Sequence, residues 1–179
     1  MKTEKLERYL ADNTHVNCAL HVDIANQCCY LLDPDLSRIN CYAVSTSILP
    51  PSNLKDSFGT PSGLHKICEC IGGDQPIGMR FVGRTPTGDI VPIETQKPAE
   101  GSPDDYVLSR ILWLAGLEPG VNQGSNVDTF QRYIYFHGTN EEYLIGSPAS
   151  HGCIRMVNAD LVALFELVEP DTPVLICID

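Results

Sequence analysis

The chain has 179 residues, a length typical of one domain, and we expect residues 1–179 to form a single unit. Its composition is 43% hydrophobic, 20% charged and 7% aromatic, which excludes disordered, collagen-like and coiled-coil classes. The formal net charge is −11, from 12 basic and 23 acidic side chains. Because a field of that sign repels phosphate backbones and anionic headgroups, we expect neither nucleic acid nor a membrane as a partner.

The start of the chain predicts a short helix at about residues 2–13, where Leu6, Tyr9 and Leu10 have helical spacing. Charges interrupt this segment, whereas a secretion signal needs an apolar run of about 7–15 residues. No stretch approaches the roughly 20 apolar residues of a membrane span. Of the 8 cysteines, most alternate with apolar residues in strand-like runs, which predicts reduced core thiols. We therefore expect a cytoplasmic location.

Alternating runs rich in β-branched residues predict a mainly antiparallel β-structure. The expected strands are residues 15–24, 28–32, 38–47, 64–71, 110–115, 132–136 and 172–178. Residues 72–103, with many glycines and prolines and apolar pieces at 79–82 and 90–93, predict a long loop or hairpin over the main sheet. Residues 157–168 predict a helix with Asn158 as its N-cap. The expected fold class is mainly β, a sandwich or partly closed barrel with one or two short helices.

The chemistry of the chain concentrates in two short elements, Phe136-His137-Gly138-Thr139 and Ser150-His151-Gly152-Cys153-Ile154-Arg155. A cysteine accompanied by histidines has what a thiol nucleophile needs, because an imidazole can take the thiol proton. A glycine before the cysteine lets a substrate approach the backbone, and N–H groups at such a turn can hold an oxyanion. The alternative is a core thiol that happens to lie beside a histidine.

These two elements, together with Gly59-Thr60-Pro61-Ser62-Gly63, resemble the L,D-transpeptidase catalytic domain, or YkuD family, over about residues 16–178. The resemblance implies a β-sandwich-like fold and no cofactor or metal. It also implies the substrate, a peptidoglycan stem peptide that is attacked between the L-centre of meso-diaminopimelate and the terminal D-alanine.

The resemblance assigns catalytic roles residue by residue. Cys153 is the nucleophile that forms a thioester, and His137 is the general base, oriented through the main chain near Gly138. His151 shapes the pocket and the oxyanion region. Gly152 and Cys153 supply backbone N–H donors.

Four further residues are expected to bind substrate. Arg155 lies where a guanidinium fork suits a substrate carboxylate, or else it is a surface arginine at the mouth of the last helix. Ser150 alternatively serves as a structural hydrogen-bonder, and Tyr135 as a core or rim residue. The expected substrate-binding residues are Tyr135, Thr139, Ser150 and Arg155.

The segment 72–103 contributes two more candidates for a carboxylate or phosphate group, Arg80 and Arg84. Solvated charge is their alternative explanation. The segment itself either closes over the acceptor side of the site or is a passive connection.

Water or an amine can resolve the thioester, and the residues alone do not choose between them. Because no export segment is evident, we expect an L,D-carboxypeptidase that trims stem tetrapeptides, free or linked to sugar or nucleotide, in cell-wall recycling. The alternative is an L,D-transpeptidase that forms 3-3 cross-links or exchanges D-amino acids. A carbapenem adduct on Cys153 is a further expectation from the resemblance.

Other classes compete with this interpretation. His65, Cys68 and Cys70 are zinc-ligand types, but no fourth ligand is evident and strand alternation explains their spacing. A catalytically silent module that binds stem peptides would not need Cys153. A papain-like protease is disfavoured because its cysteine precedes its histidine in the chain.

Overall fold

The computed structural model describes residues 3–98 and 105–178, which form strands, two helices and connecting turns. The strands are β1 (Ala19–Asp23), β2 (Cys28–Leu32), β3 (Arg38–Ser45), β4 (Gly63–Ile71), β5 (Met79–Val82), β6 (Thr85–Ile90), β7 (Val107–Gly116), β8 (Tyr135–Gly138), β9 (Ile154–Met156) and β10 (Pro173–Cys177). The helices are α1 (Glu4–Asp12) and α2 (Asn158–Phe165), with 3-10 turns at Ser125–Val127 and Glu142–Leu144.

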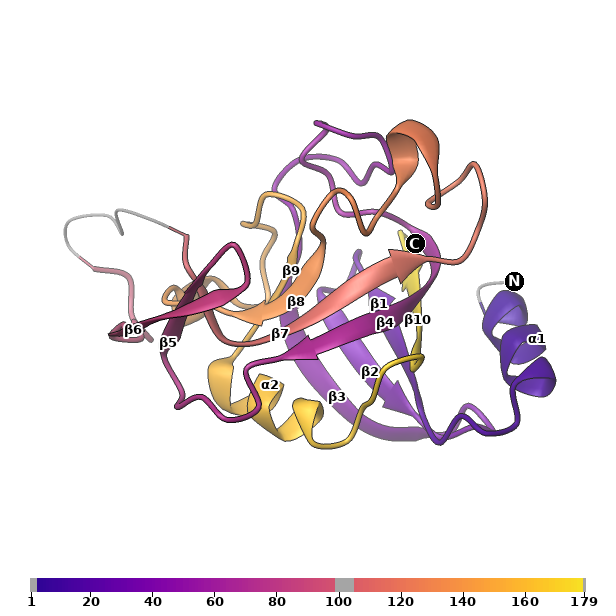
Figure 1. Cartoon of the computed structure of the whole chain (residues 1–179), viewed down its shortest axis with the longest axis horizontal. Coiled ribbons are helices and arrows are strands. Elements are labelled where there is room, and N and C mark those ends of the chain that lie inside the picture. Colours follow the sequence, from indigo (N-terminus) through magenta and orange to yellow (C-terminus); the bar gives the residue numbers. More distant parts are fainter. Residues whose placement is uncertain (1–2, 99–104, 179) are drawn as a thin grey trace.

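The strands of the described residues form one sheet in the order β4-β10-β1-β2-β3-β9-β8-β7-β5-β6. β4 also pairs with β7, which closes eight of the strands into a barrel and leaves β5 and β6 as a projecting hairpin. Figure 1 shows this hairpin at one end of the molecule and α1 at the other. The expected mainly β class with two helices is therefore confirmed, and the barrel is closed.

Alternation along the strands separates an inner core from the outer faces. Leu112 of β7, Phe136 of β8 and Ile154 of β9 point into the barrel, where Leu161 and Leu164 of α2 join the same buried cluster. On the outside, α1 packs its apolar side against the sheet in a second cluster, which contains Leu6, Leu10, Leu64 and Leu175. The third cluster lies outside β5, β7 and β8, and it includes the surroundings of Cys153.

The arrangement of the strands corrects several expectations. The sheet is mixed rather than antiparallel, because β1 pairs parallel with β10 and β8 pairs parallel with β9. Within the hairpin expected at 72–103, the second strand is β6 rather than the apolar piece at 90–93, and its side chains are all exposed and so show no apolar alternation. The strand expected at 132–136 starts later, at Tyr135, because Tyr133 has a positive φ of 57° that belongs to a turn. β9 has only 3 residues, too few to show a period.

Asn158 is not an N-cap. Helix α2 begins at Asn158 itself, and its capping residue Val157 makes no side-chain hydrogen bond. The amide of Asn158 instead connects separate elements: Oδ1 accepts from Ser109 Oγ at 2.6 Å, and Nδ2 donates to Thr139 O at 2.8 Å. The polar side chain of Asn158, at the start of an apolar helix, therefore links α2 to β7 and to the residue that follows β8.

The cysteines are less buried than the sequence predicts. Cys18 and Cys29 are core residues, but Cys41 is exposed and the others are intermediate. The difference arises because β2 and β3 expose one face of the sheet, so that alternating positions such as Cys28 and Cys41 point outward. None of the eight, all of which lie in the described part of the chain, forms a disulfide.

His65 is buried in β4, and its hydrogen bonds argue against the zinc alternative. Nδ1 lies 3.0 Å from Gly63 O and Nε2 lies 3.1 Å from Thr129 Oγ1. Both ring nitrogens are thus engaged within the chain. The described residues contain no group of three or more side chains of metal-ligating type.

Burial lowers the pKa of His65 to about 4, and we expect stability to depend on pH as a result. The unfolded chain takes up the proton near pH 6.5, so the free energy of unfolding should fall as the pH drops from about 6.5 to about 4. His65 contributes up to about 3 kcal/mol to this fall, at roughly 1.4 kcal/mol per pH unit. Urea unfolding across this range measures the slope, and NMR titration of the His65 ring is the control. A ring that protonates near pH 6.5 in the folded protein would contradict the prediction.

None of the described helices is both long and apolar enough to span a membrane.

Candidate active site

A tight turn places Cys153 at the start of β9. Gly152 has a φ of +124°, which glycine adopts far more readily than other residues. The hydroxyl of Ser150 closes the turn, since Oγ donates to Cys153 O at 2.6 Å and accepts from Gly152 N–H at 3.2 Å. The glycine and the serine of the second sequence element therefore position the cysteine.

Strand register brings the cysteine and the first histidine to the same face. His137 pairs with Arg155 across the parallel β8–β9 ladder and with Ile111 across the antiparallel β7–β8 ladder. Paired residues share a face, and residues two apart along a strand do too. Cys153 is two residues before Arg155. Its side chain therefore lies on the outer face of the barrel wall, as do those of His137 and Tyr135. Cys153 packs against the apolar cluster on that outer face.

The sulfur of Cys153 is half-buried and contacts the backbone of β8 and of the turn before it. Tyr135 N–H donates to Sγ at 3.4 Å, and the thiol donates to Tyr133 O at 3.4 Å. Burial raises the pKa of this thiol to about 12, although the Tyr135 N–H acts in the opposite direction. The resting site therefore holds a neutral thiol, which needs a base before it can attack.

His137 has the properties of that base. Its ring is buried, and Nδ1 lies 2.8 Å from Gly138 O. A carbonyl oxygen only accepts, so Nδ1 carries the hydrogen and Nε2 presents a lone pair. Burial lowers the pKa of His137, while the nearby Asp105 carboxylate acts against that effect. The imidazole is thus neutral near pH 7 and able to take a proton.

Gly138 is required by packing as well as by this hydrogen bond. A Cβ at residue 138 would lie 2.0 Å from Asn158 Oδ1, a distance that no folded chain accommodates. Asn158 therefore packs directly against the backbone that orients His137. The sequence contained no signal for this contact beyond a polar residue in an apolar helix.

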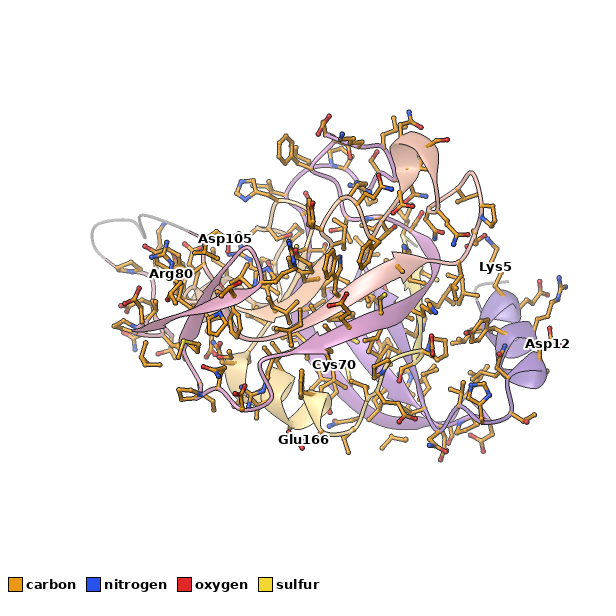
Figure 2. All side chains as sticks on the ribbon, viewed as in Figure 1. Lys5, Asp12, Cys70, Arg80, Asp105 and Glu166 are labelled. Atoms are coloured by element: carbon orange, nitrogen blue, oxygen red, sulfur yellow. The ribbon has the colours of Figure 1, made fainter. Side chains whose placement is uncertain are left out.

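Arg155 is neither a surface residue nor available to substrate in this structure, which corrects both expectations. It is wholly buried, and Nη1 lies 3.0 Å from Asp105 Oδ1 and 2.9 Å from Glu141 Oε2. The same Asp105 lies 3.7 Å from Nδ1 of His151, whose side chain is 69% exposed. Asp105 lies at the end of the molecule that carries the β5–β6 hairpin (Figure 2). Arg155 therefore anchors a carboxylate beside both histidines.

We expect Arg155→Met to destabilise the protein by roughly 3–5 kcal/mol, because it leaves two partly buried carboxylates without their cation. Chemical unfolding measures the loss. Arg38→Met is the matched control, since Arg38 is an exposed arginine over the Tyr30 ring and should change stability by less than about 0.5 kcal/mol. Equal effects of the two variants would contradict the buried ion-pair argument.

Ser150 and Thr139 are positioning residues rather than substrate contacts, because both are wholly buried. Thr139 Oγ1 accepts from Glu141 N–H at 3.0 Å, which fixes the chain after β8. The oxyanion role expected for the Gly152 N–H also needs correction, since Ser150 already accepts that hydrogen. The Cys153 N–H is the remaining backbone donor of the pair.

The Gly59–Gly63 element lies in a loop that is connected through Ser47 to Ser150, in the turn before Cys153. A Cβ at Gly59 would lie 2.4 Å from Pro50 O, so the loop closes on itself only with glycine there. Arg132 holds the same loop by donating to Ser52 O at 2.9 Å and to Gly59 O at 2.6 Å. Thr60 Oγ1 accepts from the N–H of Ser47, which bridges to Ser150.

An aromatic shelf, formed by Trp113, Phe130, Tyr133 and Tyr135, lies beside Cys153. Trp113 stacks on Phe130 with ring centroids 3.9 Å apart and meets Tyr135 edge-on at 5.7 Å. Tyr135 lines this shelf as well as contacting the sulfur, which is compatible with its expected place in the cleft. The sequence shows no pattern that groups Trp113 with Phe130 and Tyr133, because Trp113 lies in β7 and the other two lie in the turn before β8.

A pocket of about 190 Å³ lies on the other side of Tyr133. Its charged groups are Lys55, Asp56 and Arg132, and His151 also lines it. His151 thus lies at the rim of a pocket. The pocket therefore has two basic side chains, Lys55 and Arg132, and one carboxylate, that of Asp56.

The closed β-barrel thus presents a cysteine and a buried, neutral histidine on the same outer face, the residue types of a cysteine–histidine nucleophile site. Residues 19–176 match the YkuD family, described as the L,D-transpeptidase catalytic domain. The chain belongs to this family.

Relatives and solved structures agree with this membership. The chain is 34% identical over 103 residues to YqjB of Bacillus subtilis (strain 168), whose L,D-transpeptidase assignment is itself provisional. The match covers 53% of this chain and 53% of YqjB, so the chain spans about half the length of this curated relative. The L,D-transpeptidase from Mycobacterium smegmatis shares the fold with a TM-score of 0.53 at 16% identity, over 90% of this chain and 58% of that chain. The L,D-transpeptidase LdtMt1 in complex with imipenem has a TM-score of 0.53 at 15% identity, over 90% and 59%.

Proposed function

We propose that this chain is an L,D-carboxypeptidase that removes the terminal D-alanine from peptidoglycan stem tetrapeptides through a thioester on Cys153. The observation that carries the proposal is the placement of a protonated Cys153 thiol on the same outer face as the neutral His137. Family membership supports the substrate class, a stem peptide with D-alanine after meso-diaminopimelate.

The first half of the reaction uses these two side chains and the turn. Nε2 of His137 takes the proton from Sγ, and the sulfur adds to the carbonyl carbon of diaminopimelate. The Cys153 N–H donates to the oxyanion. The carbon–nitrogen bond then breaks, its electron pair stays with nitrogen, and the imidazolium returns the proton to that nitrogen. D-alanine leaves, and the tripeptide stays on Cys153 as a thioester.

In the second half water resolves the thioester. A water molecule gives a proton to Nε2 of His137 and attacks the acyl carbon. The carbon–sulfur bond breaks and Sγ regains the proton from the imidazolium. One water molecule is consumed, and the products are the tripeptide and D-alanine.

The pocket lined by His151 and Tyr133 supports water rather than an amine as the acceptor. Its volume of about 190 Å³ is below the roughly 300–1,000 Å³ of sites that enclose a whole ligand. Lys55 and Arg132 add positive charge there against Asp56 alone. Both features disfavour the cationic side-chain amine that a 3-3 cross-link requires.

Transpeptidation remains the second candidate, because the similar proteins carry that name. Mass analysis of products from a purified tetrapeptide, with and without an added D-amino acid, tests the choice. We expect tripeptide and free D-alanine in both reactions. Dimers or exchanged D-amino acids as the main products would replace hydrolysis by transpeptidation.

We also propose that the reaction takes place in the cytoplasm, on soluble stem peptides in wall recycling. The exposed thiol of Cys41 supports this location, because such thiols persist in reducing compartments. Fractionation of source cells with D-alanine release as the readout tests it, and activity confined to the extracytoplasmic fraction would contradict it.

A carbapenem adduct on Cys153 follows from the same nucleophile. Solved structures with this fold include a complex with imipenem. Intact-mass analysis after incubation with imipenem should show one added drug mass, absent in Cys153→Ala. Labelling of the alanine variant would place the reactive group elsewhere.

A further inference from the structure

The turn of the β5–β6 hairpin places an arginine over the aromatic shelf. Gly83 and Arg84 both have positive φ, 54° and 68°, as in the tight turns that favour Asn-Gly. A residue with a Cβ at the second position is strained there. The contacts of its side chain compensate for this cost.

Those contacts hold the guanidinium in one place. It lies 4.7 Å from the centroid of the Trp113 ring and 4.9 Å from that of Tyr133, and Nη1 donates to Tyr135 Oη at 3.2 Å. Cation–π contacts of this kind position an arginine without neutralising its charge. Arg84 is therefore a preorganised cation on the shelf.

Tyr135 connects this cation to the nucleophile. Its backbone N–H contacts Cys153 Sγ and its hydroxyl contacts Arg84, so one tyrosine side chain separates the charge from the reacting sulfur. In contrast to Arg155, which binds two carboxylates, Arg84 forms no ion pair within 4.0 Å among the described residues. Glu69 is the acidic residue that acts on it from farther away. Arg84 is also half-exposed, so a ligand can reach it.

The proposed reaction requires a cation near Cys153 that can bind the terminal carboxylate of the substrate. The leaving D-alanine carries a free carboxylate one carbon from the scissile nitrogen, and a carboxypeptidase must recognise this group to act only at the chain end. We propose that Arg84 binds the terminal carboxylate of the leaving D-amino acid and so selects substrates with a free C-terminus. Its planar fork of donors matches a carboxylate with two parallel hydrogen bonds. This inference rests on the proposed function.

Acylation of Cys153 by two matched substrates tests the proposal. One is the stem tetrapeptide ending in D-alanine, and the other is the same peptide ending in D-alaninamide, which lacks the charge. The rates of D-alanine and D-alaninamide release are compared for the wild type, Arg84→Gln and Arg84→Lys. Because release accompanies thioester formation, the readout is independent of whether water or an amine follows.

We expect Arg84→Gln to lower kcat/KM for the acid roughly 10- to 100-fold, the range for losing a hydrogen bond to a charged group, with little change for the amide. Arg84→Lys should recover part of the acid rate, since it keeps the charge but not the fork. Arg38→Gln is the matched control, because Arg38 also lies over a tyrosine ring, that of Tyr30, but at the opposite end of β3 from the Val44 and Ser45 positions that pair with β9.

Three results would overturn the proposal. An unchanged rate for the acid in Arg84→Gln would show that Arg84 does not bind the carboxylate. An equal loss for both substrates would limit its role to holding the hairpin. A folded wild type that releases neither D-alanine nor D-alaninamide would overturn the proposed function itself, and the inference with it.

Discussion

Cys153→Ala should abolish D-alanine release and thioester formation while leaving the fold intact. The loss is complete because the sulfur forms the bond to the acyl group, and among the described residues no other thiol belongs to the apolar cluster on that outer face. Sγ makes two long hydrogen bonds of 3.4 Å, with the N–H of Tyr135 and the carbonyl of Tyr133, so truncation costs little stability. Intact-mass analysis measures the thioester, and thermal unfolding measures the fold.

The control for this prediction is a cysteine outside the site. Cys41→Ala, on the exposed face of β3, should retain wild-type activity. Residual turnover in Cys153→Ala would assign the nucleophile to another residue. Tight peptide binding by the wild type with no turnover would instead favour a catalytically silent binding module, because such a module does not need the thiol.

His137→Gln should lower kcat/KM by roughly 10²–10⁴-fold, the usual contribution of a general base. The thiol depends on this base because burial holds its pKa near 12, so little thiolate exists without help. His151→Gln should cost less, because the His151 side chain is 69% exposed and lies 3.7 Å from Asp105 rather than buried against the strand. Equal losses in the two variants would remove the distinction between base and rim histidine.

The pH dependence of the wild type follows from the same histidine. Burial lowers the pKa of His137, so its neutral, proton-accepting form persists below the ordinary histidine value of about 6.5. The acid limb of the kcat/KM profile should therefore lie below pH 6.5. An acid limb above that value would mean that the base is charged in the resting enzyme.

The sequence by itself predicted a candidate nucleophile, a candidate base and the kind of scaffold. Alternating runs predicted most strands, because period-two hydrophobicity is a local property of a half-buried strand. The two short elements identified Cys153 and His137, since a thiol nucleophile and its base require particular residue types. The glycine at 152 was also readable, because a turn before the nucleophile favours a residue without a side chain.

Only the tertiary structure decided what supports these residues. Asp105, Glu141 and Asn158 come from separate segments, and closure of the barrel brings them together with Arg155 and Gly138. The sequence placed Arg155 on the surface or against substrate, because a local pattern cannot show which charges will be buried together. Strand β6 could not be predicted from the sequence because the side chains of an exposed hairpin show no apolar period. The aromatic shelf could not be predicted because stacking partners that are distant in sequence leave no pattern.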